Sequence, residues 1–298
     1  MSVPLFTGCA AAMITPFHKD GSLDMQALVR LIDMQKLAGM DALVLLGTTG
    51  EASTLTMQER EVVISLGVER AGKSMPVIVG TGANDTRRAI EYARQAKALG
   101  ANGQLCVTPY YNKSTQRGLI HHFTAIADSC DLPMILYNVP ARTGMSISAD
   151  TARTLCSHPG IVGIKEASGD LSQTADILYH TGGALPVYSG NDDVILPMMA
   201  QGAAGAISVI ANMLPAQTRA ITSACLKGCF DQAKAAQNVL LPLIRLLFSQ
   251  VNPIPVKAAL ASMGLIEDAL RLPLTPLEEP FRSKLLACMR SMKLLKET

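Results

Sequence analysis

The chain has 298 residues, of which 49% are hydrophobic, and its formal net charge is +2. So small a charge, with Lys and Arg scattered along the chain and no aromatic residues between them, argues against a nucleic-acid-binding protein. The seven cysteines form no C-x-x-C pair, which is typical of reduced thiols in a cytosolic protein rather than of disulfides or a zinc site. The length allows two domains or one large α/β barrel with an appendage.

The sequence also argues against a secreted or membrane protein. The amino-terminal residues lack a basic segment followed by an apolar run, so we expect no signal peptide. Residues 194–218 carry no charge, but Pro197, Gly205 and Pro215 interrupt them, and a membrane span needs about 20 continuous apolar residues. We therefore expect a soluble, cytoplasmic protein that binds neither membranes nor nucleic acid.

Apolar strands alternate with amphipathic helices along most of the chain. Residues 9–14 are predicted as the first strand, and Asp24 caps a helix whose apolar residues recur at the helical spacing. Residues 42–46 are predicted as the second strand, and Thr56 with Glu59 forms a capping-box pattern that opens the second helix. The remaining strands, each followed by a helical segment, are predicted over residues 77–79, 104–107, 134–137, 161–165, 187–189 and 205–209.

Eight apolar strands, each followed by a helix, predict a (β/α)8 TIM barrel over residues 1–227. Pro215, a residue favoured in the first helical turn, opens the helix after the eighth strand. A doubly wound open sheet is the alternative fold. From residue 228 the strand pattern stops, which predicts a C-terminal α-helical domain over residues 228–298. Its helices are predicted over residues 233–248, 255–263 and 277–295.

A lysine stands at the end of the sixth predicted strand. Residues 161–165 are apolar except for Lys165, and such a run is typical of a strand that is buried on both faces. One explanation for a buried lysine is an ion pair, for example with Glu166. The other is a nucleophilic amine, whose pKa falls on desolvation so that the neutral form attacks a carbonyl group.

Polar residues follow several other predicted strands. In TIM barrels the active site lies at the carboxyl ends of the strands and in the loops just beyond them. The polar residues at these positions are Thr48, Thr49, Tyr110, Tyr111, Tyr137, Asn138 and Lys165. We expect their side chains to converge at one mouth of the barrel.

Simpler interpretations exist for some of these positions. Thr48 and Thr49 also suit a turn that caps the next helix, and Tyr137 also suits a core tyrosine with a backbone partner. The Gly-Thr-Gly-Ala-Asn segment at residues 80–84 suggests phosphate binding only weakly, because a third glycine and an acidic partner are missing. Loop geometry is the better interpretation of that segment.

Five segments of the chain form a recognisable set of motifs. They are Gly47-Thr48-Thr49-Gly50-Glu51, Thr108-Pro109-Tyr110-Tyr111-Asn112, Tyr137-Asn138-Val139-Pro140-Ala141-Arg142-Thr143-Gly144, Gly163-Ile164-Lys165-Glu166-Ala167 and Asn252-Pro253-Ile254-Pro255-Val256-Lys257. Together they resemble the dihydrodipicolinate synthase family of pyruvate-dependent class I aldolases, in the same order and over nearly the whole chain. The resemblance implies a barrel with a helical C-terminal domain, usually a homotetramer of two tight dimers. It also implies condensation of pyruvate with aspartate 4-semialdehyde in the diaminopimelate route to lysine, with no metal and no cofactor beyond a covalent pyruvate imine.

The resemblance implies roles for individual residues. Lys165 would be the Schiff-base lysine, and Tyr137 the acid–base residue beside it. Thr48 and Tyr111 would complete a hydroxyl relay with Tyr137, and Tyr111 would be supplied by the other subunit of the tight dimer. Three hydroxyl groups in a row can pass a proton without placing a full charge at the mouth.

The resemblance also implies how the substrates are bound. Thr48 and Thr49 match the pair that holds the pyruvate carboxylate, and backbone groups of Gly190 and Ile207 would line the pyruvate pocket. Arg142 would bind the carboxylate of the semialdehyde, because a planar guanidinium pairs with a carboxylate through two hydrogen bonds.

Two alternative functions stay open from the sequence. A sialic-acid-type lyase or keto-sugar-acid aldolase would share Lys165 and Tyr137 and differ in the acceptor substrate. Arg142 and the double threonine Thr48-Thr49 favour the synthase over these aldolases. A non-catalytic barrel that binds a metabolite is disfavoured, because a binding module has no use for a desolvated amine.

One group of positions departs from the family. Members that are inhibited by lysine bind it at the tight-dimer interface, and the matching positions here are Ala52, Ser53, Met57, Arg60, Asn84, Arg88 and Tyr110. Met57 and Arg60 stand where histidines are common, and Arg88 stands where an acidic residue would meet the ammonium group of the ligand. A positive charge there repels that ammonium, so we expect the protein to be insensitive to millimolar L-lysine. Alternatively, Arg60 and Arg88 solvate their helices or pair with Glu59 and Glu91.

Overall fold

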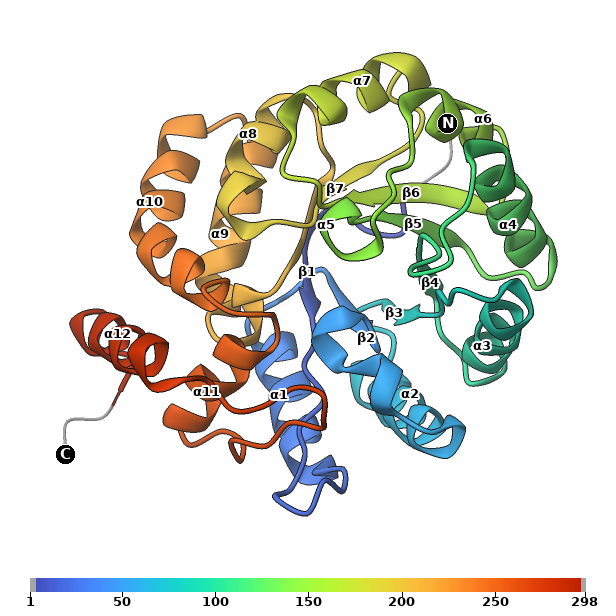
Figure 1. Ribbon diagram of the computed structural model, residues 1–298. Coiled ribbons are helices and arrows are strands. Elements are labelled where there is room, and N and C mark those ends of the chain that lie inside the picture. The colour runs from blue at the N-terminus through green and yellow to red at the C-terminus, as the bar shows by residue number, and fades with distance from the viewer. Residues whose placement is uncertain (1–3, 296–298) are drawn as a thin grey trace.

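The computed structural model describes residues 4–295 and shows a closed barrel of eight parallel strands (Figure 1). Each strand pairs with its neighbours in chain order, and the last pairs with the first to close the ring. The strands are β1 (Gly8–Ala12), β2 (Ala42–Leu45), β3 (Val77–Gly80), β4 (Gly103–Val107), β5 (Met134–Asn138), β6 (Ile161–Glu166), β7 (Val187–Ser189) and β8 (Gly205–Ser208). The predicted TIM barrel is confirmed, and the open doubly wound sheet is wrong.

Helices surround the barrel, one after each strand (Figure 1). They are α1 (Met25–Leu37), α2 (Met57–Ala71), α3 (Thr86–Ala98), α4 (Gln116–Asp128), α6 (Ala149–Cys156), α7 (Leu171–Thr181), α8 (Ile195–Ala200) and α9 (Pro215–Leu226). Shorter turns lie in the loops after the strands, namely η1 (Thr48–Gly50), η2 (Ala52–Thr54), α5 (Pro140–Thr143), η3 (Asp192–Val194) and η4 (Ile210–Asn212). The predicted helix starts are confirmed: Asp24 accepts a hydrogen bond from the backbone N–H of Ala27, Thr56 and Glu59 form a capping box, and Pro215 begins α9.

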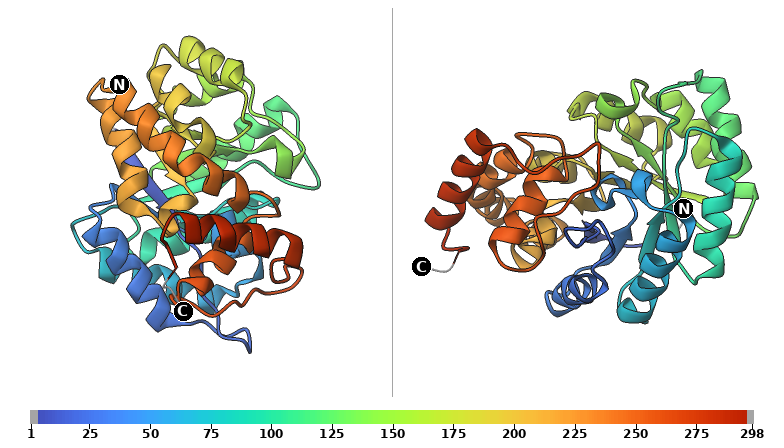
Figure 2. Two further views of the ribbon diagram at one scale, coloured as in Figure 1. Left: turned by 90° about the vertical axis from the view of Figure 1, so that its left-hand side faces the viewer. Right: turned by 60° about the horizontal axis from the view of Figure 1, so that its bottom comes forward.

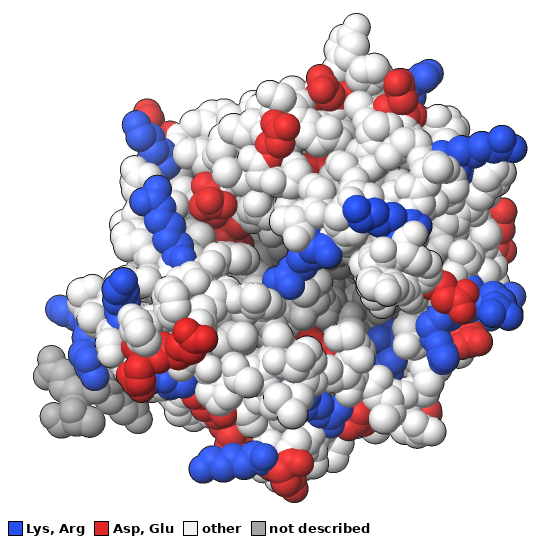
Figure 3. Space-filling model, in the orientation of Figure 1, with Lys and Arg blue, Asp and Glu red and all other residues white. Residues whose placement is uncertain are grey.

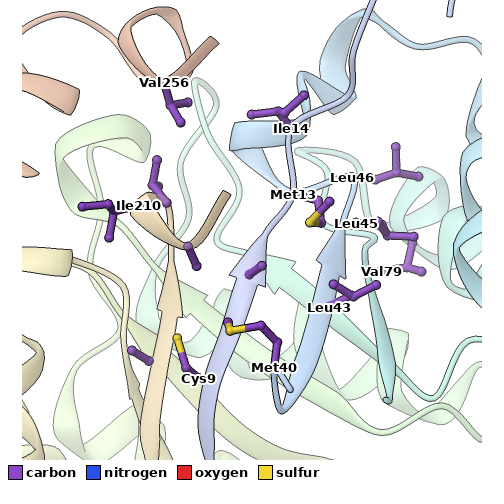
Figure 4. Packing of buried hydrophobic residues seen from close by; sticks show 14 of the residues in the cluster. Cys9, Met13, Ile14, Met40, Leu43, Leu45, Leu46, Val79, Ile210 and Val256 are labelled. Carbon is purple, nitrogen blue, oxygen red and sulfur yellow. The ribbon is translucent and has the colours of Figure 1, made fainter. Parts of the chain in front are cut away.

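The side chains of the strands alternate between two packed layers, as the two-residue period of a β-strand requires. Outward-facing residues such as Leu43 and Leu45 pack beneath the surrounding helices (Figure 4). Inward-facing residues, among them Val44 and Tyr137, fill the barrel itself. Because Tyr137 pairs in register with Lys165 on the neighbouring strand, both side chains face the barrel interior.

Three helices follow the barrel and lie on one side of it (Figures 1 and 2). They are α10 (Phe230–Leu247), α11 (Ile254–Ser262) and α12 (Glu279–Ser291). Leu240, Leu243 and Val256 from these helices join the same apolar cluster as the outward-facing strand residues. The helical content predicted beyond residue 228 is therefore confirmed, whereas the division into domains 1–227 and 228–298 stays a prediction.

Within residues 4–295, no helix is both long and apolar enough to cross a membrane. The uncharged stretch 194–218 instead forms the short α8, strand β8, the turn η4 and the start of α9. Gly205 begins β8 and Pro215 begins α9, whereas Pro197 lies inside α8.

Candidate active site

The carboxyl ends of β2 to β5 and the loops after them line a cavity of about 390 Å³. Figure 3 shows the hollow near the middle of this face, with Lys or Arg side chains on its rim. The cavity is lined by Leu46, Gly47, Thr48, Ala52, Ser53, Arg60, Gly80, Gly82, Tyr92, Leu105, Val107, Tyr110, Tyr137, Val139, Arg142 and Thr143. The cavity thus brings together Thr48, Tyr110, Tyr137 and Arg142, whereas Thr49, Tyr111 and Lys165 do not line it.

Lys165 lies at the end of β6 with only 5% of its surface exposed. Its Nζ atom is 4.6 Å from the centroid of the Tyr137 ring on β5. The alternative explanation, an ion pair with Glu166, is wrong, because the carboxylate of Glu166 accepts hydrogen bonds from Asn138 and from the backbone of Ser168 instead. The amine is therefore a buried group next to a phenol rather than one half of a salt bridge with Glu166.

A second contact ties the two strands together behind this pair. Asn138 and Glu166 are the next paired residues along β5 and β6, so their side chains point outward. The expectation that the Asn138 side chain converges with the others at the mouth is therefore wrong. The amide of Asn138 donates to Oε2 of Glu166 at 2.7 Å, and its carbonyl oxygen accepts from the backbone of Ile147 at 2.9 Å. Burial raises the pKa of the Glu166 carboxyl. This contact fixes the strand ends that carry Tyr137 and Lys165.

Gly190 gives Lys165 the space that it occupies. The backbone N–H of Gly190 donates to the carbonyl of Glu166 at 2.7 Å, so the two chain segments lie close together. A Cβ atom at position 190 would lie 2.9 Å from Cε of Lys165 and 2.5 Å from Cβ of Ala167. Ile207 is fully buried in the inner layer of the barrel. Neither Gly190 nor Ile207 lines the cavity at the mouth, so their predicted roles in the pyruvate pocket stay predictions.

Thr48 and Thr49 form the turn η1 directly after β2. The idea that they cap the next helix is wrong, because Thr56 caps α2. Thr48 lines the cavity, whereas the Thr49 hydroxyl is buried and accepts a hydrogen bond of 2.9 Å from the side-chain amide of Asn252. The turn therefore places one threonine in the cavity and ties the other to the C-terminal helices.

Arg142 belongs to α5, the extra turn after β5, and lines the cavity from its rim. Its Nη2 atom donates to the backbone carbonyl of Asn252 at 3.1 Å. The rest of the guanidinium has donors for a carboxylate.

Tyr111 does not join this constellation within one chain. Its side chain is 92% exposed, and its backbone φ is 70°. The neighbouring Tyr110 lines the cavity instead. The prediction that Tyr111 acts in the site of a second subunit is compatible with this exposure and stays a prediction.

Of the positions that match the lysine-binding site of the family, Ala52, Ser53, Arg60 and Tyr110 line the cavity, whereas Met57, Asn84 and Arg88 do not. Arg60 is only 1% exposed, its guanidinium carbon lies 3.9 Å from the centroid of the Tyr92 ring, and its Nη2 atom donates to the carbonyl of Gly80 at 2.8 Å. Burial lowers the pKa of Arg60 to about 10, so it stays protonated at neutral pH. The alternative interpretation, in which Arg60 solvates its helix or pairs with Glu59, is wrong.

The other arginine at these positions behaves as the alternative interpretation predicts. Arg88 pairs with Glu91 on the same helix at 3.2 Å, and both side chains are about half exposed. The carboxylate of Glu59 pairs with Arg271 from the C-terminal region.

Sequence reasoning did not identify the contacts made by the C-terminal segment. Asn252 touches Thr49 and Arg142, and Lys257 forms a buried ion pair with Glu51. The motif that contains Asn252 and Lys257 was visible in the sequence, but its partners lie between 110 and 206 residues earlier. The side chains at the mouth combine a buried amine, a phenol, hydroxyl groups and a guanidinium, which suits imine chemistry on a substrate that carries a carboxylate.

Comparison with known proteins identifies relatives over almost the whole chain. The model of the dihydrodipicolinate synthetase family matches residues 5–292. A 4-hydroxy-tetrahydrodipicolinate synthase from Alkaliphilus oremlandii is 48% identical over 291 residues, which cover 98% of this chain and 100% of the relative. The enzyme of the same name from Geobacter sulfurreducens is 45% identical over 291 residues, with the same coverage.

Solved structures agree with these sequence relatives. The crystal structure of dihydrodipicolinate synthase from Thermotoga maritima is 41% identical and superposes with a TM-score of 0.95, covering 98% of this chain and 100% of that one. The structure from Aquifex aeolicus is 42% identical, with the same TM-score and coverage.

Proposed function

Because the chain belongs to the dihydrodipicolinate synthetase family, we propose that it is a lyase that condenses pyruvate with L-aspartate 4-semialdehyde to give 4-hydroxy-tetrahydrodipicolinate. This reaction belongs to the diaminopimelate route to lysine. The single observation that carries the proposal is the buried amine of Lys165 next to the Tyr137 ring at the mouth of the barrel. An amine in this position is a nucleophile for a keto acid.

Lys165 and Tyr137 perform the covalent steps. The neutral amine of Lys165 attacks the keto carbon of pyruvate, and the Tyr137 hydroxyl donates a proton as water leaves to give the imine. Loss of a proton from the pyruvate methyl group turns the imine into an enamine, whose carbon attacks the aldehyde of the second substrate. The amino group of that substrate then closes the ring at the imine carbon and releases Lys165.

Hydroxyl groups and a guanidinium position the substrates. The hydroxyls of Thr48 and Thr49, together with backbone N–H groups of their turn, bind the pyruvate carboxylate. Arg142 binds the carboxylate of the semialdehyde from the rim of the cavity. Backbone groups of Gly190 and Ile207 complete the pyruvate pocket. No cofactor is needed, since the electrons of the enamine come from pyruvate itself.

The active form is a homotetramer of two tight dimers in the cytoplasm. The exposed Tyr111 side chain supports the dimer, because a residue of the proton relay must lie next to the buried Tyr137 phenol. An exposed side chain can do so only when a second subunit covers it. In the dimer Tyr111 would reach the Thr48 and Tyr137 hydroxyls of the other subunit.

Reduction of the imine tests the proposal directly. Incubation with pyruvate and borohydride should add one reduced pyruvate group to Lys165, measured by intact mass and peptide mapping, and Lys165→Ala should abolish the adduct. Absence of the adduct in the wild-type protein contradicts the Schiff-base reaction. Arg142→Ala should keep the adduct and lose turnover of the semialdehyde, whereas loss of both would give Arg142 a structural role instead.

A further inference from the structure

The turn that carries the double threonine is held by a residue from the far end of the chain. Asn252 lies between α10 and α11 and is buried. Its side-chain amide donates to Oγ1 of Thr49 at 2.9 Å, and its backbone carbonyl accepts from Nη2 of Arg142 at 3.1 Å. One residue outside the barrel thus contacts both groups to which we assign the two substrate carboxylates.

The bond from Asn252 sets the direction of the Thr49 hydroxyl. A threonine hydroxyl has one donor hydrogen and accepts through its lone pairs. Because the Thr49 oxygen accepts from the amide of Asn252, its hydrogen is free to donate to a carboxylate oxygen. Without that amide the hydroxyl would be able to rotate and donate elsewhere.

A buried ion pair joins the same two segments a few residues further along. Nζ of Lys257 on α11 bonds Oε1 of Glu51, and both side chains are almost completely buried. Oε2 of Glu51 accepts from the backbone N–H of Arg271 at 3.2 Å, and Lys257 also donates to the carbonyl of Ala269 at 2.9 Å. Removing one member of a buried pair leaves an uncompensated charge, so the pair resists separation of the loop from the helices.

The backbone of the turn needs such support. The double threonine lies between two non-glycine residues with positive φ, Leu46 at 55° and Glu51 at 51°. Such conformations persist only where the surrounding structure holds them. Lys257 and Arg271 hold the carboxylate of Glu51, and therefore hold one end of the turn.

We propose that Asn252 is a positioning residue for pyruvate, because it orients the Thr49 hydroxyl, and that the Glu51–Lys257 pair keeps its segment in place. The inference rests on the proposed function, since it concerns the pyruvate carboxylate. It gives the C-terminal helices a part in substrate binding: they complete the site from outside the barrel.

Substitutions at Asn252 test this role through the two Michaelis constants. Loss of one hydrogen bond in Asn252→Ala should raise the KM for pyruvate about five- to tenfold. Asn252→Asp should raise it further, because a carboxylate would accept the hydrogen that Thr49 otherwise donates to pyruvate. The KM for the semialdehyde should change by less than about twofold in both variants, since Arg142 bonds the backbone carbonyl, which both retain.

Gln250→Ala is the matched control on the same segment, because within residues 4–295 its side chain accepts one hydrogen bond, from the backbone N–H of Glu278, and the change should leave both constants unchanged. The double variant Glu51→Gln/Lys257→Met removes the ion pair without stranding a charge and should raise both constants. If both Michaelis constants of the double variant equal those of the wild type, the Glu51–Lys257 pair does not hold the Asn252 segment in place.

Borohydride trapping at saturating pyruvate separates this inference from the proposed function. An adduct on Lys165 in every variant shows that imine formation is intact, whatever the KM values are. An unchanged KM for pyruvate in both Asn252 variants overturns the positioning role. Equal rises in both constants in the Asn252 variants, together with a lower Tm, would also overturn it, because they would show a general loss of structure.

Discussion

At the scale of single residues, the absence of a side chain at Gly190 is as important as the presence of Lys165. A Cβ atom at position 190 would lie 2.9 Å from Cε of Lys165 and would displace it. Misplacement of a reacting group by about 1 Å costs on the order of a hundredfold in rate. We therefore expect Gly190→Ala to lower kcat/KM by about this factor in a coupled assay, with a much smaller effect on Tm.

Ala167 provides the control for this prediction, because its Cβ would lie nearest to the new methyl group, at 2.5 Å. Ala167→Gly alone should be active. The double variant Gly190→Ala/Ala167→Gly relieves one contact and keeps the contact with Lys165, so it should stay impaired. Recovery of wild-type activity in the double variant would show that Lys165 is not the residue that is displaced.

Two positions that match the lysine-binding site of the family carry arginine here. The structure moves the expected cause of insensitivity to L-lysine from Arg88 to Arg60. Arg60 lines the cavity, with its guanidinium over the Tyr92 ring, and its positive charge repels an ammonium group there. We expect no inhibition by L-lysine at about 1 mM, because repulsion between the two positive charges removes most of the affinity of the site for lysine. Half-inhibition below that concentration in the coupled assay contradicts this prediction.

The variants for this experiment separate the two arginines. Arg60→His removes the permanent charge from the cavity, whereas Arg88→Glu reverses a charge that already pairs with Glu91 at the surface. We expect lysine inhibition to rise in the Arg60 variant more than in the Arg88 variant. The opposite order would mean that the surface charge decides the response.

At the scale of elements, Arg271 joins the loop after α11 to the first turn of α2. Its guanidinium bonds the carboxylate of Glu59, which holds the pKa of Glu59 at about 2 rather than the usual 4.5. Because the folded pKa is lowered, the stabilisation is fully present above about pH 4.5 and is lost as the pH falls toward 2. Solvent screening at this partly exposed site reduces the contribution of the pair to the free energy of unfolding to about 1 kcal/mol.

We expect Glu59→Gln to lower the free energy of unfolding by about 1 kcal/mol at pH 7. Gln keeps an acceptor for the backbone of Thr56, so the variant isolates the charge. Urea unfolding at pH 7 and at pH 3.5 should show the difference between the two proteins shrinking at the lower pH. A difference that does not depend on pH would assign the effect to the helix cap. Glu91→Gln is the exposed control and should change little at either pH.

The same elements show what sequence can and cannot predict. Helix starts at Asp24, Thr56 and Pro215 were predictable, because caps and first-turn prolines depend on residues a few positions apart. Lys165 and Tyr137 were predictable as partners, because parallel strands of a barrel end at one mouth.

The burial of Arg60 was not predictable in this way. It depends on Tyr92 from α3 and on the backbone of Gly80 from β3, neither of which is near it in the sequence. The contacts of Asn252 with Thr49 and of Lys257 with Glu51 likewise join residues more than 200 positions apart. No local periodicity encodes such pairs.

At the scale of the whole molecule, one chain supplies every proposed group of the site except Tyr111. The Tyr111 side chain is exposed on the loop after β4, whereas Thr48 and Tyr137 line the cavity. If Tyr111 acts in the site of the other subunit, then each site needs Lys165 from one chain and Tyr111 from its partner. Such an arrangement follows naturally from a two-fold symmetric dimer, in which the same loop is exchanged in both directions.

Mixing two inactive variants distinguishes this arrangement from a relay within one chain. Lys165→Ala and Tyr111→Phe should each have little activity as homodimers. In a mixed dimer one site receives both defects and the other receives none. Random pairing makes half of the dimers mixed, so coexpression should restore about a quarter of the wild-type activity. If Tyr111 works with Lys165 of its own chain, every site in the mixture has one defect and activity stays at the level of the separate variants.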